Sequence, residues 1–294
     1  MNPPAMPPLQ LGEAVISSIV ERDGPWRRPQ DFFQTYDHAR AMRHLDGMPG
    51  QVFDRASQRL VITYRSFIVR TPHHTMLIDT CTGEDKNYQP PFDFPKRRWL
   101  DEFHATGLHF EDIDFVFCTH LHLDHCGWNT RLLNGRWVPT FPNAKYIFHA
   151  REYDTWKREA EAGRDLHGGV WRMNCLPVVE AGQALLVGDD YALDDLVTLT
   201  PTPGHSPHHC CVNIQSRGRR ASVTGDLMHH ALQVCEPDWS TAFDWDPAQA
   251  ARSRRRFFAQ VADTDTLILP VHFPCPVGGH IVSGTDGLRY RFTG

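Results

Sequence analysis

The chain has 294 residues, of which 41% are hydrophobic and 22% are charged, and its formal net charge is -5. This composition is typical of a globular protein and excludes a disordered or low-complexity chain. Acidic residues outnumber basic ones by 35 to 30, so no basic excess is present and we expect no nucleic-acid partner. The longest apolar runs, such as Leu267-Ile268-Leu269, are far too short to span a bilayer, so we expect no membrane partner.

The N-terminal residues differ in character from the rest of the chain. Pro3, Pro4, Pro7 and Pro8 predict an N-terminal arm over residues 1–50, and we expect regular structure to begin near Arg59. The arm carries Trp26 and the Phe32-Phe33 pair, which we interpret as a contact to a second subunit in a homodimer. Residues 51–294 show no linker, so we predict that they form one domain.

The eight cysteines and the absence of a secretory signal bear on the compartment. No two cysteines have the CxxC spacing of a zinc knuckle or a thioredoxin-type motif, and the N-terminus has neither a basic segment nor a long apolar one. We therefore expect a cytoplasmic protein whose thiols are reduced and mostly buried.

The order of the predicted elements indicates a mixed α/β protein. Helical spacing and end signals predict helices over 97–106, 151–162 and 247–262, the last with Asp246 as its N-cap and Pro247 in its first turn. β-branched and apolar runs predict the strands, which alternate with these helices. The strands are expected over 60–69, 75–80, 114–119, 144–148, 196–200, 210–214, 221–224 and 266–270.

Four metal-binding side chains follow the strand that ends near Thr119. They are His120, His122, Asp124 and His125. Imidazole nitrogen and carboxylate oxygen are the ligands of zinc-type ions. Alternate residues point the same way as the chain leaves a strand, so His120 and His122 can converge on one point. Asp124 and His125, past a turn, can reach a second point a few ångströms away, which is the arrangement that a two-metal site needs.

Further ligand types stand after later strands. These are His205 after Pro203-Gly204, Asp226 after Thr224-Gly225, and His272 after Pro270-Val271. Ligand sites of open sheets lie at strand ends, which favours a common site. A lone histidine after a strand is usually a surface or core residue. Three histidines packed with an aspartate into six positions would repel one another if protonated, so a structural role for this run is costly without a cation.

These motifs, in this order, resemble the metallo-β-lactamase superfamily over about residues 58–275. The resemblance implies an α/β fold of the αββα sandwich type, with two mixed β-sheets flanked by helices. It implies two divalent metal ions, most simply Zn²⁺, with Mn, Co or Fe as alternatives. His120, His122 and His205 would hold one ion, Asp124, His125 and His272 the other, and Asp226 would bridge both. Asp79, in Leu77-Ile78-Asp79-Thr80, resembles the residue that orients the metal loop in this family.

The resemblance favours the acyl-homoserine lactonase and methyl parathion hydrolase-like branch, because Asp226 stands where the clinical β-lactamases have a Cys. The best-known lactonases carry a Tyr three residues after this Asp, and here the position is His229. We predict a hydrolase that attacks a lactone or other carboxylic ester with a metal-bridging hydroxide, as in quorum quenching. Asp124 would transfer the proton to the leaving oxygen, and His229 would donate a hydrogen bond to the substrate. A structural role for His229 is the alternative.

Aromatic residues near the motifs are candidates for an apolar substrate pocket. Each can equally be ordinary core packing. The candidates are Phe92, Phe94, Trp128, Trp239 and Phe273.

Other functions remain open at this point. A phosphotriesterase or aryl esterase would use the same residues, and pocket shape would decide between them. A di-iron oxygen reductase typically has Glu where this chain has His122, and a persulfide dioxygenase lacks the second ligand set. A nuclease is disfavoured by the acidic charge, and a non-catalytic binding module by the complete ligand set.

Overall fold

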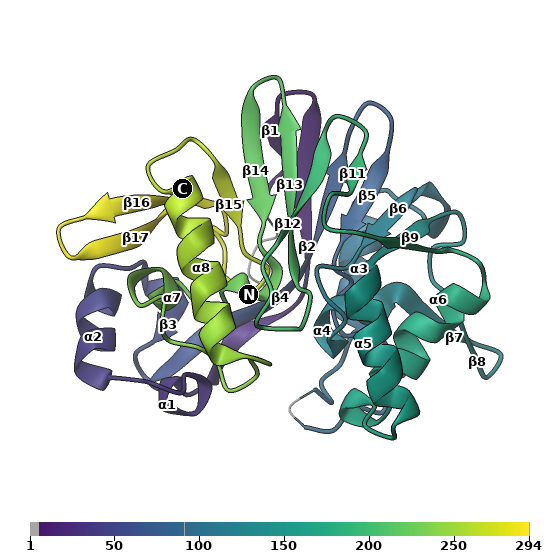
Figure 1. Ribbon diagram of the computed structural model, residues 1–294, viewed down its shortest axis with the longest axis horizontal. Helices are drawn as coiled ribbons and strands as arrows, with labels where there is room; N and C mark the ends of the chain where they lie inside the picture. The colour runs from purple at the N-terminus through teal and green to yellow at the C-terminus, as the bar shows by residue number, and fades with distance from the viewer. Residues whose placement is uncertain (1–5, 91, 294) are drawn as a thin grey trace. The chain divides into compact units, whose positions relative to one another are not determined.

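The computed structural model describes residues 6–90 and 92–293, and their contacts divide the chain into two compact units. Unit 1 is built mainly from Asp23–Thr63 and Ala192–Gly294, and unit 2 from Pro7–Arg22 and Tyr64–Tyr191. The chain passes from one unit to the other within two long strands, β2 (Ala14–Arg27) and β4 (Arg59–Arg70), and again after Tyr191 (Figure 1). The predicted division into an arm and one domain from residue 51 stays a prediction.

The central strands of unit 2 are hydrogen-bonded in the order β4, β5, β6, β9 and β10. The β4–β5 pair is antiparallel, and the following three pairs are parallel. Parallel strands buried on both faces are apolar throughout, as the Phe-Val-Phe sequence of β6 illustrates. Because the carboxyl ends of parallel strands meet at one edge, residues that follow β5 and β6 become neighbours. The bounds are β5 (Thr75–Ile78), β6 (Phe115–Phe117), β9 (Lys145–His149) and β10 (Ala184–Val187).

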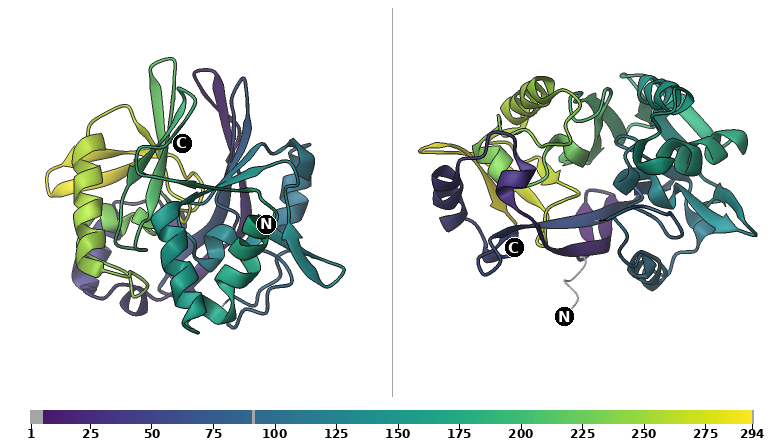
Figure 2. Two further views of the ribbon diagram at one scale, coloured as in Figure 1. Left: turned by 45° about the vertical axis from the view of Figure 1, so that its right-hand side comes forward. Right: turned by 90° about the horizontal axis from the view of Figure 1, so that it is seen from below.

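Helices and a hairpin complete unit 2. The amphipathic helix α5 (Ala150–Glu161) packs on β9 and β10, and it is one of the teal helices in the left-hand view of Figure 2. The other elements are β1 (Leu9–Leu11), α3 (Arg97–Ala105), η2 (Phe110–Asp112), α4 (Leu123–Cys126), η3 (Gly127–Asn129), β7 (Thr130–Leu133), β8 (Arg136–Pro139), η4 (Leu166–Gly168), η5 (Trp171–Cys175) and α6 (Leu176–Glu180).

Gly127 ends the histidine-rich run because no other residue fits there. A Cβ atom at this position would lie 2.1 Å from the carbonyl oxygen of Thr82 and 2.6 Å from that of Cys81. Both neighbours are backbone atoms that cannot rotate away. The glycine therefore lets the turn after α4 lie directly against the segment that follows β5, where its N–H donates to the Cys81 carbonyl at 2.8 Å.

Unit 1 contains a seven-stranded sheet in the order β11 to β17. All neighbours are antiparallel except β14 and β15, which are parallel. The bounds are β11 (Ala192–Leu193), β12 (Val197–Pro201), β13 (Cys210–Ser216), β14 (Arg219–Val223), β15 (Leu267–Leu269), β16 (Gly279–Gly284) and β17 (Gly287–Phe292).

Helix α8 (Pro247–Val261) is the longest helix of unit 1 and contacts β16 and the short helix η6 (Gly225–Leu227). The Asp246 side chain accepts a hydrogen bond from the Gln249 N–H, so the predicted N-cap and the proline in the first turn are confirmed. The remaining elements of the unit are α1 (Pro29–Phe32), α2 (His38–Asp46), η1 (Gly50–Val52), β3 (Phe53–Asp54) and α7 (Leu232–Cys235).

Every strand and helix predicted from residue 59 onward is present, with its ends within a few residues of the expected ones. The expected start of regular structure near Arg59 is wrong, because β1 and β2 begin at Leu9 and Ala14. In the first part of β2 buried residues alternate with half-buried ones, Ala14 and Ile16 being fully buried. This is the period-two pattern of a strand, which the polar residues further along β2 obscured.

The aromatic residues assigned to a dimer contact have partners within their own unit. Phe32 and Phe33 are buried, and Phe33 packs against Trp239 with 5.6 Å between ring centroids. The Trp26 indole N–H donates to the Ile62 carbonyl at 2.8 Å. These contacts account for the three side chains, and the homodimer stays a prediction. Of the predicted arm, Pro3 and Pro4 lie outside the described residues.

Two sequence expectations concern the environment of the chain. Among the described residues, no helix combines the length and the hydropathy that crossing a membrane requires. All eight cysteines lie in the described part of the chain, where they are free thiols, and six of them are buried.

His230 makes the stability of unit 1 depend on pH. Its Nε2–H donates to the Val52 carbonyl at 2.9 Å, and its Nδ1 accepts from the Leu232 N–H at 3.1 Å, so the ring is held neutral. Burial lowers the pKa of His230 from 6.5 to about 4. Because the pKa is lower in the folded protein, the stability that this group contributes is present above pH 6.5 and is lost as the pH falls toward 4.

Between about pH 7 and about pH 4.5, the free energy of unfolding should fall less in His230→Gln than in the unsubstituted protein. The two decreases should differ by up to about 3 kcal/mol. Urea unfolding of the metal-free proteins at a series of pH values measures this difference. His38→Gln, in α2, is the control and should follow the unchanged protein. Identical pH profiles for all three proteins would show that His230 does not titrate in this way.

Candidate metal centre

In unit 2, the histidine-rich run folds into a turn that gathers its side chains. His122 is the N-cap residue of α4, and this short helix reverses the chain directly after β6. The ring centroids of His120 and His125 are 4.1 Å apart, and those of His120 and His122 are 4.4 Å apart. Asp124 lies beside them, with Oδ1 3.8 Å from Nε2 of His125. The four side chains predicted as ligands from this run therefore cluster.

Asp79 organises this turn from the end of β5. Its carboxylate accepts hydrogen bonds from the Thr119 N–H at 2.8 Å and from the Thr119 hydroxyl, and it lies 2.8 Å from Nδ1 of His125. Asp79 adopts a positive φ of 55°, a conformation that costs energy in a residue with a side chain. These contacts fix which way the His125 ring faces and leave its Nε2 on the side of Asp124. This is the geometry expected of the orienting role predicted for Asp79.

In unit 1, three imidazoles surround the carboxylate of Asp226. The Nε2 atoms of His205 and His229 lie 3.0 Å from Oδ2, and Nε2 of His272 lies 2.9 Å from Oδ1. All four side chains are buried. The structure thus brings together the three ligands predicted in this unit and adds His229, whose ring stacks on that of His272 at 5.1 Å.

In two of these rings, the nitrogen that faces away from Asp226, Nδ1, has an oxygen partner. Nδ1 of His205 lies 2.9 Å from Oδ1 of Asp244, and Nδ1 of His272 lies 2.8 Å from the Thr63 carbonyl. A carbonyl oxygen can only accept, so Nδ1 of His272 carries the proton and Nε2 presents a lone pair. This arrangement is the usual one around a metal-binding histidine.

Three residues of this constellation were not identified from the sequence. His209 accepts a hydrogen bond from the Asp226 N–H at 2.9 Å, while its Nδ1 bonds the Thr202 hydroxyl at 2.8 Å. Asp244 holds His205, and Arg254 lies 3.8 Å from Asp244 and donates to the Leu227 carbonyl at 3.3 Å. No local pattern marks these residues, because each acts on a partner distant in the sequence.

The donor set of unit 1 fits a divalent cation. Asp226, His229 and His272 each offer one ligand atom, and these atoms lie within 4.8 Å of one another. Burial lowers the pKa of His205, but the carboxylates of Asp226 and Asp244 more than compensate and raise this pKa to about 9. Burial lowers the pKa of His229. A cation among the imidazoles would take the place of the proton that Asp226 otherwise holds on His205.

The predicted substrate-contacting aromatic residues are mostly packed. Trp128 is buried and stacks on Trp99, and Phe273 is buried against Tyr290. Trp239 is buried against Phe33. Phe92 and Phe94 are half-buried beside Tyr64. The contacts of the first three are those of core packing, and substrate binding by the five residues stays a prediction.

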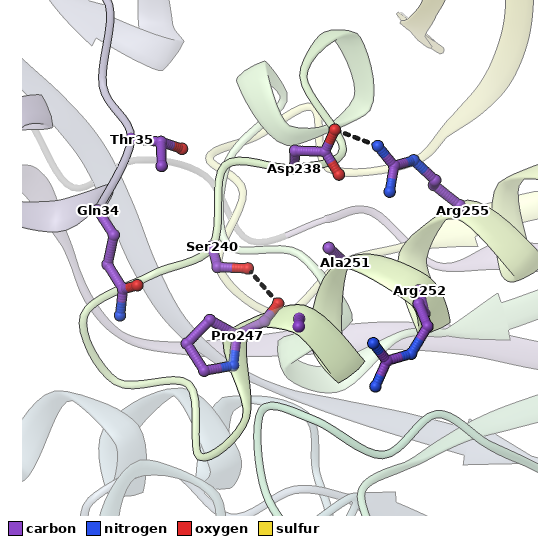
Figure 3. Close-up of a pocket in the computed structure, with 9 residues that line it drawn as sticks. Gln34, Thr35, Asp238, Ser240, Pro247, Ala251, Arg252 and Arg255 are labelled. Atoms are coloured by element: carbon purple, nitrogen blue, oxygen red, sulfur yellow. Dashed lines mark hydrogen bonds and ion pairs between the residues drawn. The ribbon is translucent and has the colours of Figure 1, made fainter.

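A cavity of about 330 Å³ lies in unit 1 at the first turns of α8 (Figure 3). Arg255 pairs with Asp238, and the Ser240 hydroxyl donates to the Pro247 carbonyl at 2.7 Å. These contacts brace the segment that carries Asp244, and no predicted ligand lines the cavity. Its lining residues are Gln34, Thr35, Asp238, Ser240, Pro247, Ala248, Ala251, Arg252 and Arg255.

Comparison with known proteins assigns the family. The sequence profile described as "Metallo-beta-lactamase superfamily" matches residues 63–286, about three quarters of the chain. The chain belongs to the metallo-beta-lactamase superfamily. The predicted family, its fold class and the predicted enzyme class, a hydrolase, are confirmed.

Solved structures of this superfamily resemble the chain over most of its length. A hydrolase named AbOPH is 21% identical with a TM-score of 0.82, covering 100% of this chain and 99% of that one. AidC, described as a dizinc quorum-quenching lactonase in complex with a product, is 20% identical with a TM-score of 0.79, covering 99% and 98%. A mutant of AiiA from B. thuringiensis with N-decanoyl-L-homoserine at its active site is 20% identical with a TM-score of 0.61, covering 90% and 94%. At these identities the likeness establishes the fold.

We expect Asp244→Ala to weaken Zn²⁺ binding about 10- to 100-fold, because the His205 ring loses the acceptor that orients it. Competition with a chromophoric chelator measures this affinity. Asp286→Asn is the control, since it changes an exposed acidic residue of the same unit between β16 and β17. Equal affinities in both variants would mean that Asp244 does not orient a ligand.

Proposed function

We propose that the protein is a dinuclear metal-dependent hydrolase of lactones or other carboxylic esters, with N-acyl-homoserine lactones as the first candidate substrates. The observation that carries this proposal is the buried carboxylate of Asp226 with three imidazole Nε2 atoms within about 3 Å of it. A buried carboxylate is costly without compensating positive charge, and a divalent cation is the charge that this donor set accepts.

The second ligand set, in unit 2, supports a pair of ions. Its four side chains cluster after β6, and Asp79 orients one of them, His125. We assign His120, His122 and His205 to one ion and Asp124, His125 and His272 to the other, with Asp226 as the bridge. The imidazole and carboxylate ligands favour Zn²⁺, with Mn, Co and Fe as alternatives.

Two side chains near the proposed ions, Asp124 and His229, would take part in the reaction. Bound divalent ions would lower the pKa of a water molecule and polarise the carbonyl oxygen of the ester. Asp124, which is only partly buried, would accept a proton at its carboxylate and pass it to the leaving oxygen. His229 would donate a hydrogen bond to the substrate from Nε2, which lies 3.0 Å from Oδ2 of Asp226.

Among carboxylic esters, the lactones are favoured by the structures that this chain resembles. AidC is described as a lactonase, and both AidC and the AiiA mutant were solved with an N-acyl-homoserine. A phosphotriesterase or aryl esterase is the second candidate, which the histidine at position 229 supports because the best-known lactonases have a Tyr there. A redox reaction stays an alternative to hydrolysis. The cytoplasmic location, the role in quorum quenching and the homodimer stay predictions.

The test is a hydrolysis panel on protein reconstituted with defined metal ions. We expect turnover of N-acyl-homoserine lactones that disappears on dialysis against a chelator and returns with Zn²⁺, at two ions per chain by elemental analysis. Aryl esters, phosphotriesters and a cephalosporin complete the panel, and Asp226→Asn is the metal-site control. Inactivity towards lactones combined with turnover of a phosphotriester would replace the first candidate by the second.

His229 can act as a substrate contact or as a further metal ligand, and the two roles predict different results for His229→Ala. We expect the variant to keep two ions per chain and to lose at least about tenfold in kcat/KM, because one hydrogen bond to the substrate is lost. Loss of one ion would make His229 a ligand. Unchanged kcat/KM with full metal content would leave it a structural residue.

A further inference from the structure

The segment Thr241–Asp246 directs one side chain inward and two outward. Asp244 is buried against His205 and Arg254, whereas its neighbours Phe243 and Trp245 are 45% and 54% exposed. In the described part of the chain, these two are the exposed large aromatic side chains. Exposed aromatic surface is unfavourable in water, so two such residues side by side in the sequence around a buried carboxylate call for an explanation.

Both aromatic residues are connected to the candidate metal centre within unit 1. The ring centroid of Phe243 lies 5.7 Å from that of Phe32, and the Phe32 ring lies 5.6 Å from that of His229. The Trp245 N–H donates to the carbonyl of His205 at 3.0 Å. The exposed surface therefore begins next to the imidazoles that surround Asp226. We call Phe32, Phe243 and Trp245 the aromatic shelf.

The shelf is held in place by hydrogen bonds on both sides. The Ala242 N–H donates to the Phe32 carbonyl at 3.0 Å, and the Asp246 N–H donates to the Gly204 carbonyl at 2.8 Å. The Thr241 N–H donates to the Asp244 carboxylate at 2.9 Å. A surface that is already ordered loses little conformational entropy when it binds a ligand. At its outer side the Arg27 guanidinium lies 5.2 Å from the centre of the Phe243 ring.

We propose that the aromatic shelf binds the apolar acyl or aryl group of the ester that the protein cleaves. The inference rests on the proposed function, because the reacting ester group would lie beside His229 and Asp226. An acyl or aryl substituent attached to that group would meet the Phe32 ring first, 5.6 Å from that of His229, and a longer substituent would reach Phe243, whose ring is 5.7 Å from that of Phe32. The shelf thereby selects esters with long or bulky apolar groups over short ones. A second copy of the chain covering Phe243 and Trp245 is the competing occupant.

The experiment compares ligands that differ only in the length of the acyl chain. We expect kcat/KM for N-decanoyl-L-homoserine lactone to exceed that for the N-butanoyl compound at least tenfold, since each buried methylene contributes up to about fourfold. Phe243→Ala and Trp245→Ala should each reduce this ratio at least threefold, mainly through KM. Phe243→Leu should reduce it less, because an apolar side chain remains. Leu132→Ala and Leu185→Ala, at exposed leucines of unit 2, are matched controls that should leave the ratio unchanged.

A binding measurement separates failure of this inference from failure of the proposed function. Calorimetric titration of the metal-free protein with ring-opened N-decanoyl- and N-butanoyl-L-homoserine requires no turnover. Tighter binding of the decanoyl compound that is lost in Trp245→Ala supports the shelf even if no lactone is hydrolysed. Chain-length independence of both turnover and binding, or no binding of either compound, overturns the inference. Conversion of a dimer into a monomer by Trp245→Ala in light scattering, with an unchanged chain-length ratio, also overturns it.

Discussion

The carboxylate of Asp226 imposes the strongest constraint on unit 1, because it is buried among imidazoles rather than in water. A buried anion requires positive charge or several hydrogen-bond donors. The surroundings of Asp226 meet this requirement from several directions. Three imidazole Nε2 atoms face its two carboxylate oxygens. The backbone on either side is held as well, because His209 accepts the Asp226 N–H and Arg254 donates to the Leu227 carbonyl.

An oxygen acceptor holds Nδ1 at three of the predicted ligand histidines. Asp79 holds Nδ1 of His125, Asp244 holds Nδ1 of His205, and the Thr63 carbonyl holds Nδ1 of His272. Each acceptor turns its ring so that Nε2 faces the carboxylates of the candidate centre. The three acceptors come from different elements, so the orientation of the ligands depends on the tertiary structure rather than on any one motif. Metal affinity in such sites depends on these outer contacts almost as strongly as on the ligands.

The segment Thr241–Asp246 connects the candidate metal centre to the aromatic shelf. Its one buried carboxylate orients His205, and this contact also fixes the position of the two aromatic residues beside it in the sequence. Arg254 of α8 contacts Asp244 and donates to the Ser240 hydroxyl, which connects this segment to the helix. The Ser240 hydroxyl in turn donates to the Pro247 carbonyl at the start of α8. Under the proposal above, a change in the aromatic pair would alter substrate preference while the hydrogen bonds of Asp244 still hold the backbone in place. Phe243 and Trp245 could therefore be exchanged to change the preferred substrate without changing a predicted metal ligand.

The sequence by itself determined eight of the strands and three of the helices after residue 59, the family and the candidate ligand types, because each depends on short-range patterns. Apolar runs predict buried strands, Asp246-Pro247 predicts a helix start, and three histidines with an aspartate in six positions predict a cation. Strand β2 escaped prediction because polar residues along its second half masked its alternation. Only the tertiary structure decided that His229 faces Asp226, that Asp244 and Arg254 support His205, and that Trp128 and Phe273 are core residues. These are pairings between residues distant in the sequence, and a linear pattern carries no information about which distant side chain will fill a given space.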